Sequence, residues 1–232
     1  YVNSDRLFEK ALADAGIDTG DLAKISKDNP ARYDAQIAGA PDPEQPYNPA
    51  SIRTVGKDRL KKLQAPYEAE RLGMLVDGTG KSRQKIARQK EKAEALGYDT
   101  YMIFVDTTLE VAQQRNLKRD RTLPEDGPEG LNAMWEACQV NKEYYQQLFG
   151  KNFALVENNV YGPLPEEIKA DVEGFIDSPV ENPLGKEWVE GELERRGVTS
   201  LEPGGASGFR GSKKSADTIR KMRGDSESRR NA

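Results

Sequence analysis

Short runs of apolar residues alternate along the chain with longer segments in which apolar residues recur at helical spacing. The run at residues 101–105 (YMIFV) is almost continuously apolar, which is typical of a strand covered on both faces of a sheet. Runs at residues 74–76 and 153–156 predict two more strands, and residues 1–5 look like the end of another. The predicted helices cover residues 6–15, 51–71, 82–96, 129–149 and 165–176, and a further helix begins at Leu109. Short buried strands that alternate with helices indicate βα units, so the sequence predicts an α/β fold with a parallel sheet flanked by helices.

Proline and glycine separate this predicted α/β body, residues 1–177, from flanking segments. Within the body, residues 26–50 contain five prolines and are predicted to form a loop or mobile insertion. Residues 178–202 are predicted to be a peripheral segment with one helix at about residues 187–196. Residues 203–232 contain few large apolar side chains and are predicted to be a disordered tail.

Composition narrows the possible chemistry. The 232 residues include no histidine, which excludes histidine general bases, histidine metal ligands and histidine pH switches. The single cysteine, Cys138, excludes an internal disulfide and fits a reducing compartment. No apolar run approaches the ~18 residues of a membrane helix, so the chain is predicted to be soluble and to make no membrane contact.

The net charge of −4 is unevenly distributed along the chain. Residues 203–232 carry eight Lys or Arg and three Asp or Glu, a balance of +5, which leaves −9 for the rest. The acidic body argues against a duplex-DNA binder with a broad basic face. The basic tail is a candidate contact for an anionic partner, although most such tails are simply solvated.

The strongest chemical signal is LGMLVDGTGKS, residues 72–82. Asp77 follows an apolar run at the predicted carboxyl end of a strand, where a carboxylate can hold Mg²⁺ directly or through water. An ordinary Asp-Gly turn would give the same pattern. The GTGKS within it is not a phosphate-binding loop, because G-x-x-x-x-G-K-[ST] would require glycine where Leu75 stands, inside the predicted strand.

Asp5 lies at the carboxyl edge of another predicted strand, the usual position for ligand-binding groups in open α/β sheets. Because the chain has no histidine, a carboxylate is the natural group to accept a proton from a hydroxyl. In the competing interpretation, Asp5 or Ser4 only caps the helix that follows. The sequence leaves both interpretations open.

A basic cluster follows the strand at residues 101–105. Arg115, Lys118 and Arg119 are predicted to occupy consecutive helical turns, with Arg121 just beyond. Forked guanidinium groups suit the oxygens of a transferring phosphoryl group. A solvated charged face of a helix is the alternative.

Two asparagines, Asn158 and Asn159, come directly after the last predicted strand. Amide side chains at that position could recognise the edge of an adenine base. Asparagine also favours turns for conformational reasons, so this signal is weak.

Taken in order, these segments resemble a known family. The matching segments are strand-NSD, strand-DGTG, GYDTYMIFVDTTLEVAQQRN, R-x-R, a tryptophan-containing helix and NFALVENN. They are similar to the zeta-toxin-like kinases, relatives of phage polynucleotide kinase, and the motif sequences most resemble those of phage-encoded members. The resemblance covers residues 1–159. It implies a P-loop kinase fold and ATP-dependent phosphorylation, with Mg²⁺, of a hydroxyl on a nucleotide, a polynucleotide end or a small metabolite. It also implies a cytoplasmic protein, in the host cytoplasm if the gene is phage-encoded.

The resemblance implies a role for each matching residue. Asp5 would activate the acceptor hydroxyl, and Asp77 would serve Mg²⁺. Asn158 would lie near the adenine, with Thr79 also at the nucleotide. The lid that closes on the ATP phosphates would comprise Arg115, Arg119 and Arg121.

In that family the phosphate-binding loop precedes the strand that ends in NSD, and so would precede Tyr1. We therefore expect a chain that lacks the central first strand of its sheet and is inactive in this truncated form. Residues 74–77 and residues 101–106 should then share no direct ladder, or should have collapsed together across the vacancy. The alternative function, from another class, is a catalytically dead nucleotide-fold module used by a phage for binding or assembly.

Overall fold

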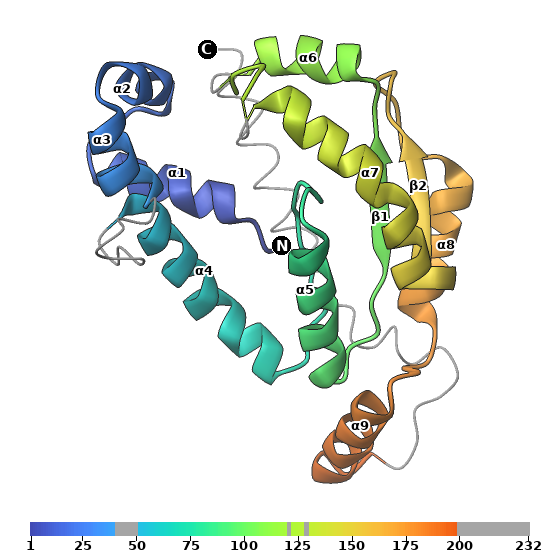
Figure 1. Cartoon of the computed structure of the whole chain (residues 1–232). Helices are drawn as coiled ribbons and strands as arrows, with labels where there is room; N and C mark the ends of the chain where they lie inside the picture. Colours follow the sequence, from blue (N-terminus) through green and yellow to red (C-terminus); the bar gives the residue numbers. More distant parts are fainter. Residues whose placement is uncertain (40–50, 120–121, 128–129, 199–232) are drawn as a thin grey trace. The chain divides into compact units, whose positions relative to one another are not determined.

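The protein is α/β with a parallel sheet accompanied by helices, as the sequence predicts, but the sheet in the described residues has two strands where the sequence predicts four. The computed structural model describes residues 1–39, 51–119, 122–127 and 130–198 (Figure 1). The predicted disordered tail, residues 203–232, lies outside the described residues. The elements are α1 (Ser4–Asp14), η1 (Thr19–Asp21), α2 (Leu22–Asp28), α3 (Pro30–Arg32), η2 (Tyr33–Ala38), α4 (Ile52–Ala69), α5 (Arg83–Ala95), β1 (Met102–Asp106), α6 (Leu109–Leu117), α7 (Leu131–Phe149), η3 (Gly150–Asn152), β2 (Phe153–Glu157), α8 (Glu166–Asp177) and α9 (Pro183–Arg195). None of the helices in these described ranges is long and apolar enough to span a lipid bilayer.

The described residues divide into two compact units. The larger unit combines Tyr1–Lys92 with Met102–Gly162. The smaller unit combines Ala93–Tyr101 with the described residues that follow Gly162. Both strands and all the described candidate site residues belong to the larger unit, so the site can be discussed within one body.

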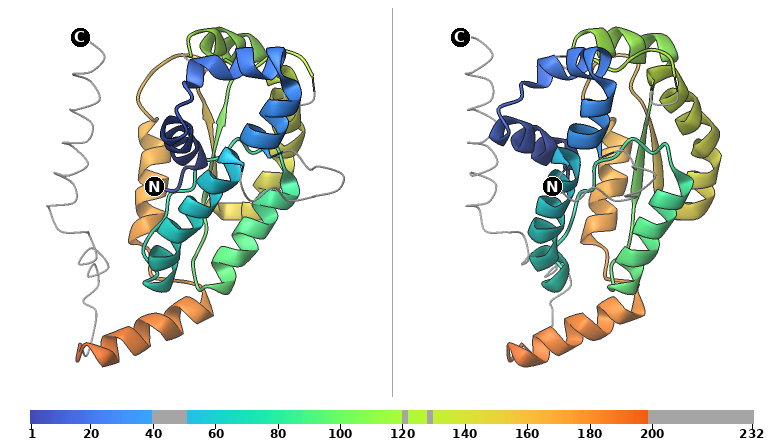
Figure 2. Two further views of the ribbon diagram at one scale, coloured as in Figure 1. Left: turned by 90° about the vertical axis from the view of Figure 1, so that its left-hand side faces the viewer. Right: turned by 60° about the vertical axis from the view of Figure 1, so that its left-hand side comes forward.

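The sheet of the larger unit consists of β1 and β2. The two strands are parallel, and their register runs from Met102 opposite Phe153 to Asp106 opposite Glu157. Helix α7 packs against one face of the pair (Figure 2), where the buried Phe104 ring lies 6.2 Å from a tyrosine ring of α7. Because parallel strands end at the same edge, Asp106 and Glu157 mark the carboxyl edge of this sheet.

A second parallel contact involves the two other predicted strands. Val2 and Val76 form an isolated bridge, in which Val2 N donates to Leu75 O (2.8 Å) and Asp77 N donates to Val2 O (3.1 Å). The sequence predicts full strands here, but the structure has only this one-residue bridge. Among the described residues, no ladder joins residues 74–77 to β1.

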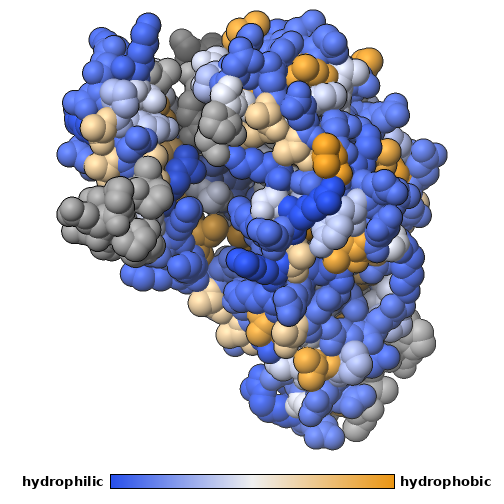
Figure 3. Space-filling view, viewed as in Figure 1, coloured by the Kyte–Doolittle hydropathy of each residue, from blue (hydrophilic) through white to orange (hydrophobic). Residues whose placement is uncertain are grey.

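The limited pairing leaves apolar strand residues accessible to solvent. Leu75 is 62% exposed, Val76 49% and Val105 55%. The prediction that the strand at residues 101–105 is covered on both faces is therefore wrong at Val105. The physical reason is that α7 packs on the face to which Phe104 points, whereas Val105, the next residue of the strand, points to the opposite face. Apolar residues of this kind appear as isolated orange areas on a mostly hydrophilic surface (Figure 3).

The N-terminal helices have a small core of their own. Phe8 and Leu12 from α1 pack with Leu22 and Ile37, and all four side chains are buried. Helices α1 and α4 approach closely at Gly56, where an added Cβ would lie 3.1 Å from the Cα of Phe8. The close packing of these two helices therefore favours glycine at this position.

This core overturns part of the predicted loop at residues 26–50. Residues 26–28 and 30–38 are helical, because they complete α2 and form α3 and the π-helical turn η2. Asn29 caps α3 by accepting a hydrogen bond from Arg32 N, and the proline that follows it stands at the first helical position, where proline is tolerated. The fully buried Ile37 then fixes η2 onto the core. Residues 40–50 lie outside the described residues.

In the smaller unit, Asn182 determines where α9 begins. Its Oδ1 accepts from the backbone of the first helical turn, and its Nδ2 donates to Glu94 O (2.8 Å) and Tyr98 O (3.2 Å). Helix α9 therefore starts at Pro183, earlier than the predicted start at about residue 187.

Candidate functional site

The first group of candidate residues lies where the Val2–Val76 bridge ends. Asp77 Oδ2 accepts hydrogen bonds from Tyr1 Oη (2.7 Å) and from Asn3 Nδ2 (2.8 Å). In the described structure, Asp77 Oδ1 has no hydrogen-bond partner, and the residue is exposed. The Asp77 carboxylate is thus held by one oxygen and open at the other.

Asp5 lies at the same end of the paired segments as Asp77. The helix cap is Asn3, whose Oδ1 accepts from Asp5 N (2.7 Å) and Arg6 N (3.3 Å). The interpretation in which Asp5 or Ser4 caps α1 is therefore wrong. Asp5 stands exposed in the first turn of α1, where the helix dipole favours a negative charge.

The loop that follows Asp77 is held by α7. Thr79 O accepts a hydrogen bond from the Cys138 thiol (2.8 Å), and Gly80 O accepts from Tyr145 Oη (2.5 Å) and Asn141 Nδ2 (3.3 Å). Burial raises the pKa of the Cys138 thiol, which keeps it protonated as a donor. Thr79 therefore contributes its carbonyl to the anchoring of the loop.

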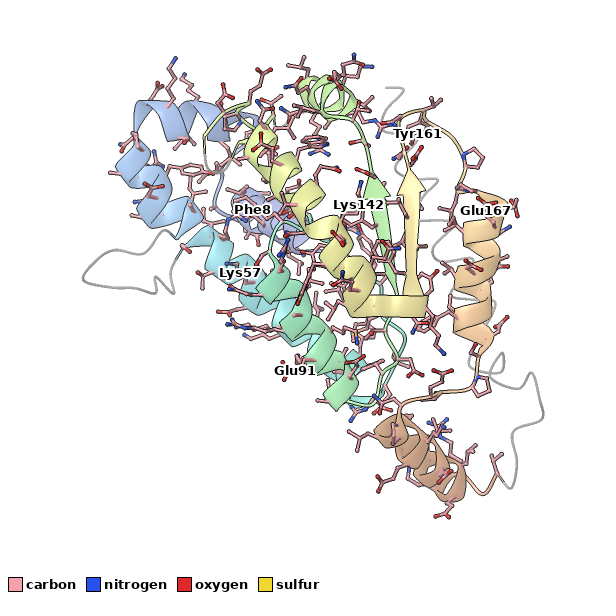
Figure 4. The ribbon with its side chains drawn as sticks, turned by 45° about the vertical axis from the view of Figure 1, so that its right-hand side comes forward. Phe8, Lys57, Glu91, Lys142, Tyr161 and Glu167 are labelled. Atoms are coloured by element: carbon pink, nitrogen blue, oxygen red, sulfur yellow. The ribbon has the colours of Figure 1, made fainter. Side chains whose placement is uncertain are left out.

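Asp106 ends β1 in the same way that Asp77 ends the shorter apolar run. Gln139 and Lys142 of α7 donate to its two carboxylate oxygens, at 2.6 and 2.7 Å respectively. Burial opposes ionisation of Asp106, but these bonds outweigh it and hold the pKa of the carboxyl below its ordinary value. Figure 4 labels Lys142 where α7 passes β1. Helix α7 therefore anchors both the loop after Asp77 and the carboxyl end of β1.

The helix that carries the predicted arginine lid is shorter than expected. Arg115 lies in α6 and its Nη2 donates to Asn158 Oδ1 (3.4 Å). Helix α6 ends at Leu117, so Arg119 lies beyond it, exposed, in contrast to the prediction of consecutive helical turns. The cause is the buried Asn116, whose side chain bonds both the N–H and the C=O of Leu123 and so turns the chain away from the helix. The predicted lid residue Arg121 lies outside the described residues.

The two asparagines after β2 have backbone roles. Asn158 N donates to Asp106 O (2.8 Å), which continues the β1–β2 pairing by one bond. Asn159 Oδ1 accepts from Thr108 N (2.8 Å). Together these bonds join the segments that leave the two strands at the carboxyl edge.

A surface hollow of about 490 Å³ opens at this edge. Its wall includes Trp135 of α7, whose Nε1 donates to Thr107 O (2.8 Å). The residues that line the hollow are Asp106, Thr107, Thr108, Leu109, Glu110, Trp135, Gln139, Glu157 and Asn159.

The structure thus brings the predicted residues into two groups. Asp5 and Asp77 lie together at the Val2–Val76 bridge, and Arg115 lies with Asn158 at the end of β2. In the described part of the chain, no hydrogen bond or ion pair joins Arg115 or Arg119 to Asp77.

The sequence did not point to two residues that shape this region, the acidic Asp106 and the polar Asn141. Asp106 could have been found by the criterion applied to Asp77, since it also follows an apolar strand. Asn141 gave no signal, because nothing in a helical sequence marks which polar residue faces a loop distant in the chain.

A scan against protein-family models, a search of curated proteins and a search of solved structures each returned no significant match to this chain.

Proposed function

We propose that this chain forms the body of an ATP-dependent phosphotransferase, similar to the zeta-toxin-like kinases, that phosphorylates a hydroxyl of a nucleotide, a polynucleotide end or a small metabolite. The observation that carries the proposal is the parallel bridge between Val2 and Val76, because it sets Asp5 and Asp77 at one edge. Open α/β sheets bind their ligands at the carboxyl edge. We place the reaction in the cytoplasm, that of the host if the gene is phage-encoded.

Asp5 is the proposed general base. In the transfer, the acceptor oxygen forms a bond to the γ-phosphorus of ATP, and the bond from that phosphorus to the β–γ bridging oxygen breaks to release ADP. The hydroxyl proton passes to the Asp5 carboxylate. The exposed position of Asp5 on the first turn of α1 leaves it accessible to an acceptor from solution.

Asp77 fits the requirements of a Mg²⁺ ligand. Mg²⁺ is commonly bound through one or two carboxylates, with water and phosphate oxygens as the other ligands. Asp77 Oδ2 is oriented by Tyr1 and Asn3, and Oδ1 is open. Within the described ranges, no three Cys, Asp or Glu side chains are grouped as a metal site, so water and phosphate would supply the other ligands. Bound Mg²⁺ would neutralise phosphate charge.

The arginines are proposed to hold the phosphates. Arg115 is already oriented by Asn158, which in this proposal lies beside the adenine of ATP. Arg119, exposed beyond α6, and Arg121 complete the proposed lid. Thr79, held to α7 through its carbonyl, is proposed to contact the nucleotide.

Replacing Asp5 by asparagine tests the proposal in the full-length protein that contains this chain. We expect transfer to slow by about 10²–10⁴-fold, because the base is lost, while ATP binding is unchanged. Binding is measured by calorimetry and transfer with γ-labelled ATP. Glu9→Gln is the matched control, since Glu9 is an exposed carboxylate one turn further along α1. Equal loss of binding and turnover in the Asp5 variant would contradict the general-base role.

A second candidate is a catalytically dead nucleotide-fold module for binding or assembly. It is favoured by the exposed apolar side chains of Leu75 and Val105, which offer an apolar surface to a partner. The amino-acid sequence of the full-length protein distinguishes the two candidates. A G-x-x-x-x-G-K-[ST] segment before the residue numbered Tyr1 supports the enzyme, and its absence there supports the module.

A further inference from the structure

The hollow at the ends of β1 and β2 contains several polar groups that are already bonded to the protein. Both carboxylate oxygens of Asp106 accept hydrogen bonds, and the Gln139 amide donates to Asp106 and accepts from Lys142. The indole N–H of Trp135 is bonded to Thr107 O. A ligand would therefore meet Trp135 as a fixed aromatic surface and not as a hydrogen-bond donor.

Other polar groups in the hollow have no partner in the described structure. The Glu157 carboxylate makes no hydrogen bond or ion pair, and the same is true of Glu110 at the rim. Asn159 uses only its Oδ1, which leaves the two N–H donors of its Nδ2. Glu157 and Asn159 are two residues apart at the end of β2 and both line the hollow. The open groups are thus an aromatic face, a carboxylate and an amide donor.

We infer that this hollow binds a guanine base. A guanine ring offers two adjacent donors, N1–H and N2–H, which match the two oxygens of the Glu157 carboxylate. Its O6 is an acceptor on the same edge and matches Asn159 Nδ2. The flat ring can stack on Trp135, as bases do on aromatic side chains.

Adenine matches the same groups less well. Its corresponding edge presents one donor, N6–H, next to the acceptor N1, so a carboxylate would face one favourable and one repulsive partner. An anionic group such as a phosphate is disfavoured within the hollow by Glu110, Glu157 and Asp106. The base end of a nucleotide therefore fits the hollow, with its phosphates outside.

This inference rests on the proposed phosphotransfer, for which it names guanine as the base of the acceptor nucleotide while ATP remains the donor, and its test requires no phosphate. The protein is titrated with guanosine, adenosine and xanthosine while the fluorescence of Trp135 is followed. The Trp188→Phe background leaves Trp135 as the only indole, because the chain has two tryptophans. We expect guanosine to bind at least tenfold more tightly than adenosine.

Glu157→Gln supplies the decisive variant. An amide accepts from N1–H but presents a donor to the guanine amino group, so guanosine affinity should fall by about tenfold to a hundredfold. Xanthine carries an oxygen in place of that amino group, so xanthosine should become the tightest ligand of the variant. A merely structural role of Glu157 would not exchange one base for another. Glu136→Gln, an exposed carboxylate of α7 next to Trp135 and outside the hollow, should leave all three affinities unchanged.

Three results would overturn the inference. The first is equal affinity for guanosine and adenosine, and the second is no change of base preference in Glu157→Gln. The third is quenching of the Trp135 fluorescence by agmatine, an alkylguanidinium cation, with no response to guanosine or adenosine. Each of these leaves the phosphotransfer proposal standing. Conversely, guanosine binding without any transfer from ATP to a guanine nucleotide would uphold the hollow as a guanine site and refute the catalytic assignment.

Discussion

Replacing Asn141 by alanine tests how firmly α7 holds the loop that follows Asp77. The Asn141 side chain is 6% exposed, and its Nδ2 donates to Gly80 O (3.3 Å) and Lys81 O (3.0 Å). Its Oδ1 accepts from Arg83 Nε (2.6 Å). Three partly buried bonds at about 0.5–1.5 kcal/mol each suggest a loss of about 3 kcal/mol in the free energy of unfolding.

The loss is measured by urea unfolding and by thermal melting followed by circular dichroism. For a protein of this size, about 3 kcal/mol corresponds to a fall in Tm of roughly 6–12 °C. Gln146→Ala is the matched control, because Gln146 is an exposed residue of the same helix. If Asn141→Ala costs less than about 1 kcal/mol, or no more than the control, α7 does not anchor the loop and the argument for a fixed Asp77 environment fails.

Two further predictions concern stability. The folded-state pKa of Asp106 is lowered, so its contribution to stability is complete above the unfolded value of about 3.9 and is lost as the pH falls through the folded value. Urea midpoints measured between about pH 5 and pH 2 should fall more steeply for the wild type than for Lys142→Met, and parallel profiles would contradict the ion pair. Gly56→Ala should destabilise the protein by about 1–3 kcal/mol, because its Cβ would lie 3.1 Å from the backbone of Phe8. Gly191→Ala, with no atom within 4 Å of the added Cβ, should stabilise α9 by up to about 1 kcal/mol, so equal melting temperatures of the two variants would refute the packing argument.

The hydrophobic pattern predicted the elements of the larger unit better than their pairing. The apolar runs gave β1 and β2 nearly to the residue, and apolar residues at helical spacing gave the main helices to within a few residues. The pattern could not show that the segments ending at Asn3 and Asp77 meet in a single bridge. Strand pairing depends on which backbone groups meet in space, and residue hydropathy carries no record of that.

The sequence-based predictions were wrong where a side chain bonds to a residue several positions away, and where prolines were taken to indicate a loop. The prolines after residue 26 suggested a loop, but a proline at the start of a helix is compatible with α3, and Ile37 is buried in the N-terminal core. The basic cluster suggested a continuous helix, but Asn116 bonds the backbone of Leu123 and ends α6 early. The sequence identified Asp77 from its place after an apolar run, whereas Asn141 could be recognised only from the structure.

The most direct test of the central claim is a measurement of where a divalent cation binds. Mn²⁺ can be added with nucleotide to the ¹⁵N-labelled full-length protein, and the paramagnetic broadening of each amide resonance recorded. The account predicts the strongest broadening at residues 2–5 and 77–79, and loss of this pattern in Asp77→Asn. Broadening centred on another part of the chain, or a pattern unchanged in Asp77→Asn, would show that Asp5 and Asp77 do not form the catalytic centre.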